Sequence, residues 1–372
     1  MDIGIFQLLS QPDGVSDREV IEQALWEVDF AEANGFHTVW ITEHHLSEYG
    51  LIGTPSVYAA AVAQRTRRLR IGYGVAVVPL HHPIRLAEEI AWVDQLCEGR
   101  LWVGVGPGFS PYEFEAFGVP LDERTARLEE GIAIVQGLLA NETFSYQGRY
   151  WQIPEVRLKP RPFTTPHPPL MLASSGEESL QRAARLGLPA LIGFRPNEEL
   201  VTRIATYREV RQSLGVPEER LREEVRQLGV LRRIHVADSD AEAMADVVPP
   251  LLWYTETGLR VHRRNASIAL DPKTGARLGV YVPPQTGSLP DGSAAPVMPS
   301  PEDVIRHSEG GMIAGTPDTV LRQLRDLQAL GIGHVIAWMN FGNMPYPKVR
   351  RSMELFAREV LPALTASEVP LR

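Results

Sequence analysis

The chain has 372 residues, of which 44% are hydrophobic and 22% charged, a composition typical of a globular protein with a large buried core. Its formal net charge of −9 argues against nucleic acid or an anionic membrane as the main partner. The only cysteine, Cys97, excludes an intramolecular disulfide framework and any metal site built from several cysteines.

Short apolar segments rich in β-branched residues recur along the chain and predict strands. In chain order they are Ile3–Phe6, Thr38–Thr42, Leu69–Val78, Leu101–Val105, Pro169–Ala173, Ala190–Phe194, Leu228–Val236 and His334–Met339. Segments with helical periodicity lie between and after them, at Asp17–Asn34, Ser56–Arg67, Pro83–Leu96, Asp122–Leu139, Glu177–Leu186, Glu198–Leu214, Asp240–Thr257, Pro317–Leu330 and Pro347–Val360.

This alternation of helices with nearly continuous apolar strands predicts a parallel sheet that is covered on both faces. Eight such units without a break in composition predict a single (β/α)8 TIM barrel over residues 1–372. A doubly wound open sheet is the alternative. It would normally open with a glycine-rich first turn, whereas residues 7–16 contain only Gly14.

Two segments depart from the repeating pattern. Phe144–Ile153 predicts a hairpin around Gln147 and Gly148, inserted before the fifth strand. Residues 259–311 form a long insertion, rich in proline and glycine, between the seventh helix and the eighth strand. We expect it to be a lid over the barrel, with surface decoration as the alternative.

In a barrel of this kind the working site lies at the C-terminal ends of the strands. Glu43, His44 and His45 follow the second strand, where alternation points Glu43 and His45 one way and His44 the other. One imidazole can serve there as a general base, and a purely structural network is the alternative.

A metal site is a further possibility, built from His44, His45, His81, His82 and His235. We expect no metal, because adjacent histidines rarely ligate one ion together and His82-Pro83 is typical of a helix start.

Glycine-rich and serine-rich turns follow the fourth and fifth strands. The segment Gly104–Gly108 is not a dinucleotide fingerprint, because Pro107 removes a backbone donor and the third glycine comes too early. Its glycines instead permit close approach of a flat ligand or of a neighbouring backbone. Ser174, Ser175 and Gly176 open directly onto a helix, which favours phosphate binding, with simple capping by Ser175 as the alternative.

Taken together, these segments resemble the bacterial luciferase-like flavin monooxygenases, and in particular the luciferase α chain. The resemblance rests on these segments: Gly35–Gly50 with its Glu-His-His element, His82–Glu89, Asp94–Arg100, Gly315–Pro317, Ser352–Phe356 and Val360–Pro362. It covers most of the chain outside residues 259–310.

The resemblance implies a (β/α)8 barrel that binds reduced FMN supplied by a separate flavin reductase. Oxygen adds to the flavin C4a, and the resulting peroxyflavin oxygenates a small, mainly apolar substrate such as an aldehyde or ketone. His44 is the implied catalytic residue, supported by His45. The implied cofactor-binding residues are Glu43, Gly74, Val75, Gly106, Ser174, Ser175 and Gly176, with a cis peptide between Gly74 and Val75 beneath the flavin ring.

The sequence also departs from the luciferase pattern. Gly106 and Pro107 occupy the places of a reactive cysteine and a phosphate-binding arginine, so we expect another arginine, such as Arg195, to replace the latter. Ser174 stands where luciferase has an acidic residue, which removes a repulsion from phosphate. These changes argue against light emission.

The remaining expectations concern the substrate, the partners and the location. We expect the substrate pocket to be lined by Phe6, His45, Phe109, Phe194, Trp253 and Trp338. The resemblance implies a homodimer through Ser56–Arg67 and Pro83–Leu96, where Ala59–Ala61 and Trp92 suit close helix packing or simply a buried core. Without a signal peptide or an apolar run of about 18 residues, we expect a cytoplasmic protein.

Two other activities remain open on the same barrel. One is hydride transfer with the deazaflavin F420, and the other is flavin binding without turnover.

Overall fold

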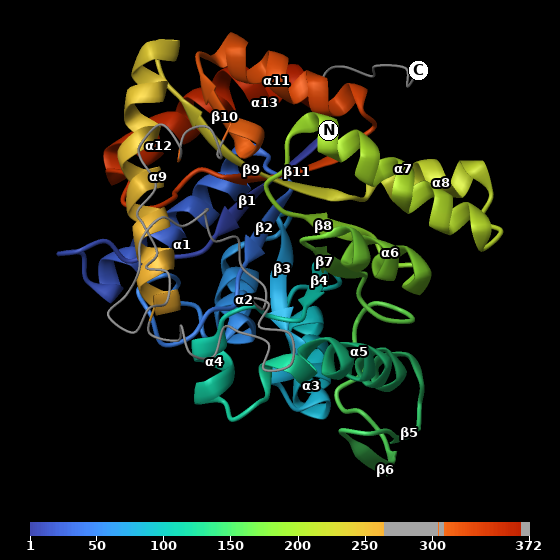
Figure 1. Cartoon of the computed structure of the whole chain (residues 1–372). Coiled ribbons are helices and arrows are strands. Elements are labelled where there is room, and N and C mark those ends of the chain that lie inside the picture. Colours follow the sequence, from blue (N-terminus) through green and yellow to red (C-terminus); the bar gives the residue numbers. More distant parts are fainter. Residues whose placement is uncertain (264–303, 305–308, 366–372) are drawn as a thin grey trace, which may run out of the picture.

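A computed structural model describes residues 1–263, 304 and 309–365 of the chain (Figure 1). Within these residues eight parallel strands close into a barrel, which confirms the predicted fold. Their order around the barrel is β1 (Asp2–Gln7), β2 (Thr38–Ile41), β3 (Arg70–Val77), β4 (Leu101–Gly106), β7 (Leu170–Ser174), β8 (Ala190–Ile192), β9 (Gly229–Val236) and β11 (His334–Trp338). Closure comes from β11, which pairs with β9 on one side and with β1 on the other.

Helices follow the strands and cover the outside of the barrel. They are α1 (Asp17–Asn34), α2 (Pro55–Arg65), α3 (Pro83–Leu96), α5 (Arg124–Ala140), α6 (Glu177–Leu186), α7 (Asn197–Ser213), α9 (Asp240–Arg263), α11 (Pro317–Ala329), α12 (Tyr346–Leu355) and α13 (Leu361–Thr365), with a π-helical turn at Phe356–Val360. The first of them shows why these boundaries were predictable. Ser16 caps α1 in a capping box with Glu19, and Gly35 ends it with φ of 80°.

The elements α4 (Pro111–Ala116), α8 (Glu218–Arg226) and β10 (Met312–Gly315) were not predicted, and neither was the short last helix α13. In addition, α9 continues six residues beyond the predicted end at Thr257, although Gly258 follows that residue. The later part of α9 packs near α4 (Figure 1), so tertiary contact outweighs the local signal of the glycine.

The predicted hairpin is present as β5 (Phe144–Gln147) and β6 (Gln152–Val156). It lies at the edge of the molecule beside α5 (Figure 1). Most of the predicted insertion, residues 264–303 and 305–308, lies outside the described residues, and the expected lid therefore stays a prediction. Its last residues, Glu309–Gly311, form a short 3₁₀ turn before β10, which pairs with the end of β9.

The barrel interior is filled by large side chains around Trp40, which is fully buried and packs with Met171, Leu191 and Ile336. Two glycines make room for its indole ring. A β-carbon would lie 2.9 Å from that ring at Gly4 and 2.5 Å from it at Gly72, and both distances are too short for any side chain. The interior at this level is therefore a packed core, as expected for a TIM barrel.

No helix in the described part of the chain combines the length and the apolar character that crossing a membrane requires.

Candidate functional site

The buried carboxylate of Glu43 organises the end of β2. Its Oε1 lies 3.0 Å from Nε2 of His45 and 2.9 Å from Nε2 of His81, and the backbone N–H of Val77 donates to Oε2 over 2.8 Å. Burial alone would raise the pKa of Glu43, but the bonds from His45 and His81 and the charge of His81 hold it at about 2. Glu43 is thus a fixed anion that ties β2 to the end of β3.

His44 points away from this network, as the alternation along the strand predicts. Its Nδ1 lies 3.1 Å from Oε1 of Glu113, and the same oxygen accepts the backbone N–H of His45 over 2.9 Å. A carboxylate can only accept, so the neutral imidazole carries its proton on Nδ1 and keeps a lone pair on Nε2. Its ring edge contacts Tyr49 and Phe109, with ring centroids 4.8 and 5.6 Å away. His44 is thus oriented and tautomerically fixed, which a general base needs.

Sequence analysis missed Glu113, which lies on the short helix α4 and is 3% exposed. Its only sequence signal is the pattern Ser110-x-x-Glu113, typical of a helix capping box. The side chain does not cap α4. It serves His44 and His45 instead.

Aromatic rings from β1, α9, β11 and the loops that follow β2 and β8 meet at the C-terminal ends of the barrel strands. We call Phe6, Tyr49, Phe194, Tyr254 and Trp338 the aromatic cluster. Trp338 is its centre, with ring centroids 5.6 Å from Phe6, 6.1 Å from Phe194 and 4.9 Å from Tyr254. Tyr254 also hydrogen-bonds the hydroxyl of Tyr49, which links the cluster to His44.

The structure therefore brings Phe6, Phe194 and Trp338 together, as predicted for a substrate pocket, and Phe109 joins them through His44. The α9 ring in the cluster is Tyr254, the neighbour of the predicted Trp253. His45 lies elsewhere, with its ring against Glu43 and Phe117.

Arg233 lies inside this cluster and was also missed. Its guanidinium carbon is 3.8 Å from the ring centroid of Phe194 and 5.3 Å from those of Tyr254 and Trp338. A signal was present in the sequence, because adjacent arginines 232 and 233 interrupt an otherwise apolar strand. Arg232 faces the other way, toward Asn197 at the start of α7.

The turn from β7 into α6 holds the predicted phosphate residues. Gly176 is the N-cap, and its N–H donates to the hydroxyl of Ser179, so the alternative of capping by Ser175 is wrong. Ser174 is buried within the turn and Ser175 is exposed. Arg195, the predicted substitute arginine, donates to the carbonyl of Ser175 and so lies at this turn.

Several features of this edge of the barrel fit a bound flavin phosphate and ring. A β-carbon built at Gly176 or Gly193 would meet no atom within 4 Å, so the ends of β7 and β8 face open space. The hydroxyl of Ser110 is buried and without a hydrogen-bond partner among the described residues. The acidic start of α6 opposes an anion, but Glu178 is paired with Arg182 at 2.7 Å.

The Gly74–Val75 peptide bond is cis, as the resemblance implies. Gly104 and Gly106 lie beside it. Their β-carbons would approach the Tyr73 carbonyl within 2.1 Å and the Val75 side chain within 2.7 Å. Of the two expected roles for these glycines, the close approach of a neighbouring chain segment is therefore the one that the structure confirms.

The five histidines considered for a metal site are divided among four different partners. His45 and His81 share Glu43, while His44 binds Glu113. His82 caps α3, as predicted, and His235 pairs with Asp246.

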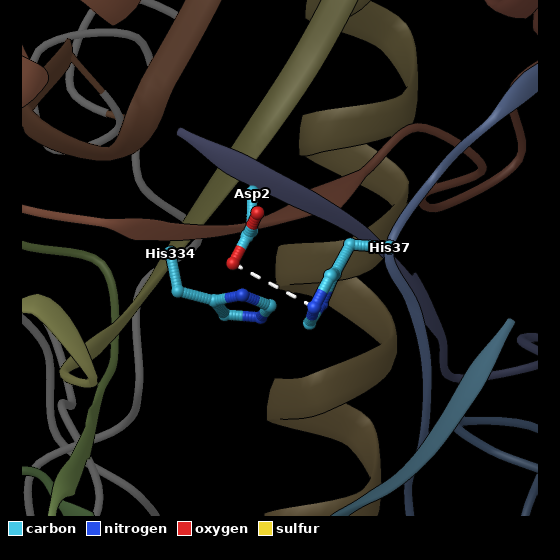
Figure 2. Close-up of side chains that lie close together, drawn as sticks. All are labelled: Asp2, His37 and His334. Atoms are coloured by element: carbon cyan, nitrogen blue, oxygen red, sulfur yellow. Dashed lines mark ion pairs between the residues drawn. The ribbon is translucent and has the colours of Figure 1, made fainter. Parts of the chain in front are cut away.

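A different cluster, Asp2, His37 and His334, lies at the opposite end of the barrel (Figure 2). His37 Nε2 and Asp2 are 3.6 Å apart, and Nε2 of His334 accepts the Trp40 indole N–H over 2.9 Å. Neutral His334 then carries a proton on Nδ1, so neither nitrogen has a free lone pair for a metal. Burial lowers the pKa of His334 to about 3, which keeps it neutral.

A cavity of about 360 Å³ lies elsewhere, between the start of α7 and α11, and is lined in part by Asn197, Arg232 and Gln323. None of the predicted site residues lines it.

Comparison with known proteins gives one family. A model described as luciferase-like monooxygenase matches residues 1–334. The oxygenase component of a flavin-dependent trigonelline monooxygenase from Acinetobacter baylyi is 26% identical over 378 residues, covering 99% of this chain and 97% of that protein. The alkanal monooxygenase alpha chain of Photorhabdus laumondii is 28% identical over 216 residues, covering 58% of this chain and 60% of that one. The match to an uncharacterized Sinorhizobium fredii protein spans 49% of its length.

Solved structures show the same barrel. The monooxygenase RslO1 from Streptomyces bottropensis superposes with a TM-score of 0.77 at 27% identity, covering 98% of this chain and 100% of that one. An F420-dependent secondary alcohol dehydrogenase shares the fold with a TM-score of 0.70 at 18% identity, covering 98% of each chain.

Proposed function

Because this chain belongs to the luciferase-like monooxygenase family, we propose that it is the oxygenase component of a two-component flavin-dependent monooxygenase. It uses reduced FMN from a separate flavin reductase, and O2, to oxygenate a small, mainly apolar substrate such as an aldehyde or ketone. One oxygen atom enters the substrate and the other leaves as water. The protein works in the cytoplasm, where reductases can supply the reduced flavin.

The observation that carries this proposal is the His44–Glu113 pair at the edge of the aromatic cluster, in which Glu113 is buried and His44 is partly exposed. Glu113 holds the proton on Nδ1 of His44, so Nε2 is available to accept or return a proton at the reacting atoms. The aromatic cluster offers an apolar, water-poor surface for the organic substrate.

For the flavin, the N–H groups at the start of α6, which follow the turn of Ser174, Ser175 and Gly176, would donate to the phosphate. Arg195, which lies at this turn and also pairs with Glu199 at 3.1 Å, would supply its remaining guanidinium donors. The cis segment Gly74–Val75 would lie against the ring, with Gly106 behind it. Bound reduced flavin supplies the electrons that activate dioxygen. Glu43 keeps the neighbouring strand ends in place.

The test is isotopic labelling. The purified protein is mixed with FMNH2 and ¹⁸O2 in the presence of linear aldehydes and cyclic ketones, and products are examined by mass spectrometry. We expect one ¹⁸O atom per oxygenated product. Reduction of F420 by an alcohol under anaerobic conditions would establish the deazaflavin activity instead. Tight FMN binding with no product in either assay would favour a non-catalytic flavin protein.

We also propose a homodimer through α2 and α3. Large apolar side chains are exposed on these helices, with Val57 69% and Trp92 57% accessible. Exposed apolar side chains on two helices that contact each other are typical of an interface, and a second copy of the same face is self-complementary.

Replacing Trp92 with glutamate is therefore expected to raise the dimer dissociation constant by more than about tenfold, because it places an unpaired charge in an apolar interface. Sedimentation equilibrium measures this against the 41.3 kDa monomer mass. The matched control is Val201→Glu on α7, a residue that is also half exposed. A wild-type protein that sediments as a monomer, or a Trp92→Glu variant as dimeric as the control, would refute the interface.

A further inference from the structure

Arg233 is a buried cation that has no counter-ion within the part of the chain that the structure describes. The residue is 7% exposed, and among the residues that the structure describes it forms no ion pair. Its Nε is fully buried and has no hydrogen-bond partner there. A buried charge without a partner is costly in free energy, so an unpaired guanidinium at the end of a barrel strand calls for an explanation.

Two other arginines with little exposure, Arg203 and Arg211, are paired with carboxylates. Arg232, which is 2% exposed, has no ion pair among the described residues but donates to oxygens of Leu231 and Asn197. Both terminal nitrogens and Nε of Arg211 are engaged, with Glu224 oxygens 2.8 Å from Nε and Nη2. Nε and Nη2 of Arg203 contact Oε1 of Glu199 at 2.9 and 2.7 Å, although its Nη1 is buried without a partner among the described residues. Arg233 differs from these arginines because, within the described residues, its guanidinium has no oxygen acceptor.

The surrounding rings compensate the charge of Arg233 only in part. Phe194 lies 3.8 Å from the guanidinium carbon and provides a cation–π contact. An aromatic face, however, offers no oxygen to the N–H donors of the guanidinium. Those donors are left for an acceptor that is not part of the described chain.

Two phenols add to this set of donors. Tyr49 and Tyr254 share one hydrogen bond, which uses one of their two hydroxyl protons. The second proton is available to an acceptor between them and Arg233. Burial raises the pKa of both tyrosines, so they remain neutral donors and do not supply a negative charge.

From this arrangement we propose that Arg233, assisted by the Tyr49–Tyr254 pair, binds an anionic group of the substrate. The preferred substrate is then a flat, apolar molecule that carries a carboxylate. The inference rests on the proposed function, since it takes the aromatic cluster to be the substrate site. In this proposal, Arg233 determines the preference for a negatively charged substrate over a neutral one.

The anion that Arg233 binds could also be a phosphate, and the flavin carries one. The turn of Ser174, Ser175 and Gly176 lies on β7, separated from β9 by β8, and Arg195 serves that turn. Arg233 is therefore expected to take no part in holding the flavin phosphate, and FMN and riboflavin separate the two sources.

The experiment measures binding by equilibrium dialysis of benzoate and phenylacetate, each beside its neutral amide. Wild-type protein is expected to bind the acids at least about tenfold more tightly than the amides, the usual effect of a charge-assisted hydrogen bond. Arg233→Gln should reduce that preference to within about twofold, while Arg233→Lys should retain part of it. Because Arg232 faces away from the cluster, Arg232→Gln is the matched control and should keep the preference.

Thermal melts check that each variant is folded. If Arg233→Gln does not fold, the test is made with Arg233→Lys. A wild-type protein without preference for acids, or an Arg233→Gln variant that keeps it, would overturn the proposal. So would an Arg233→Gln variant that loses affinity for FMN but not for riboflavin, because Arg233 would then serve the phosphate. Binding needs neither oxygen nor reduced flavin. An absence of oxygenation would therefore refute the proposed function and leave this result standing.

Discussion

Replacing His44 with alanine is expected to lower the rate of oxygenation by about 10²–10⁴-fold, the usual contribution of a positioned acid–base group. The change removes the imidazole whose Nε2 faces away from Glu113, while the residues proposed to hold the flavin phosphate remain. Stopped-flow kinetics with FMNH2 and the substrate found by ¹⁸O labelling measures the rate. Flavin fluorescence measures the dissociation constant of FMN, which should change by less than about threefold.

His167→Ala is the matched control, since that imidazole contacts the carbonyl of Pro168 before β7, at the opposite end of the strand from the site. Its oxygenation rate should equal that of the wild type. A His44→Ala variant with wild-type turnover would remove His44 from the proposed mechanism. Loss of FMN binding in that variant would give His44 a structural role.

The second large effect is on stability. Glu43→Ala is expected to lower the free energy of unfolding by about 3–5 kcal/mol, because it removes the buried acceptor of two imidazoles and of the Val77 N–H. Urea denaturation measures this. The control Glu88→Ala removes an exposed pair with Arg85 and should cost no more than about 1 kcal/mol.

The difference in unfolding free energy between wild type and Glu43→Ala depends on pH through the protonation of Glu43 and of its partner His81. The pKa of Glu43 is lowered from 4.5 to about 2, so its contribution is present above pH 4.5 and is lost as the pH falls toward 2. For His81, burial opposes protonation, but the bond to Glu43 outweighs it and raises the pKa from 6.5. Its contribution is present below pH 6.5 and is lost as the pH rises through the raised value.

The difference between wild type and Glu43→Ala should therefore be largest between about pH 4.5 and 6.5. A difference that is independent of pH from 3 to 8 would show that Glu43 contributes through packing alone.

The barrel was predictable because each strand is a short apolar run and each helix carries its own start and stop signals. Local patterns also located His44 at a strand end, and family resemblance suggested its role. Glu113 was not predictable in the same way. It lies on a helix of six residues, too short for a periodic pattern, and its contact with His44 joins residues 69 positions apart.

The same limit applies to the aromatic cluster. The sequence indicates Phe6, Phe194 and Trp338 at strand ends, but it does not tell which residue of α9 faces them. Trp253 and Tyr254 are adjacent, and only the tertiary packing selects Tyr254. Arg233 was overlooked because strand periodicity treats residues by polarity and carries no information on whether a buried charge has a partner.

The indole of Trp40, which lies between Gly4 and Gly72, is fully buried and fills the interior of the barrel at this level. In the proposed reaction the coenzyme, the organic molecule and the gas would then not pass along the barrel axis and would reach the site from the C-terminal ends of the strands. The order of arrival would constrain the order of departure, so release of the spent coenzyme and of the product become linked steps of each turnover.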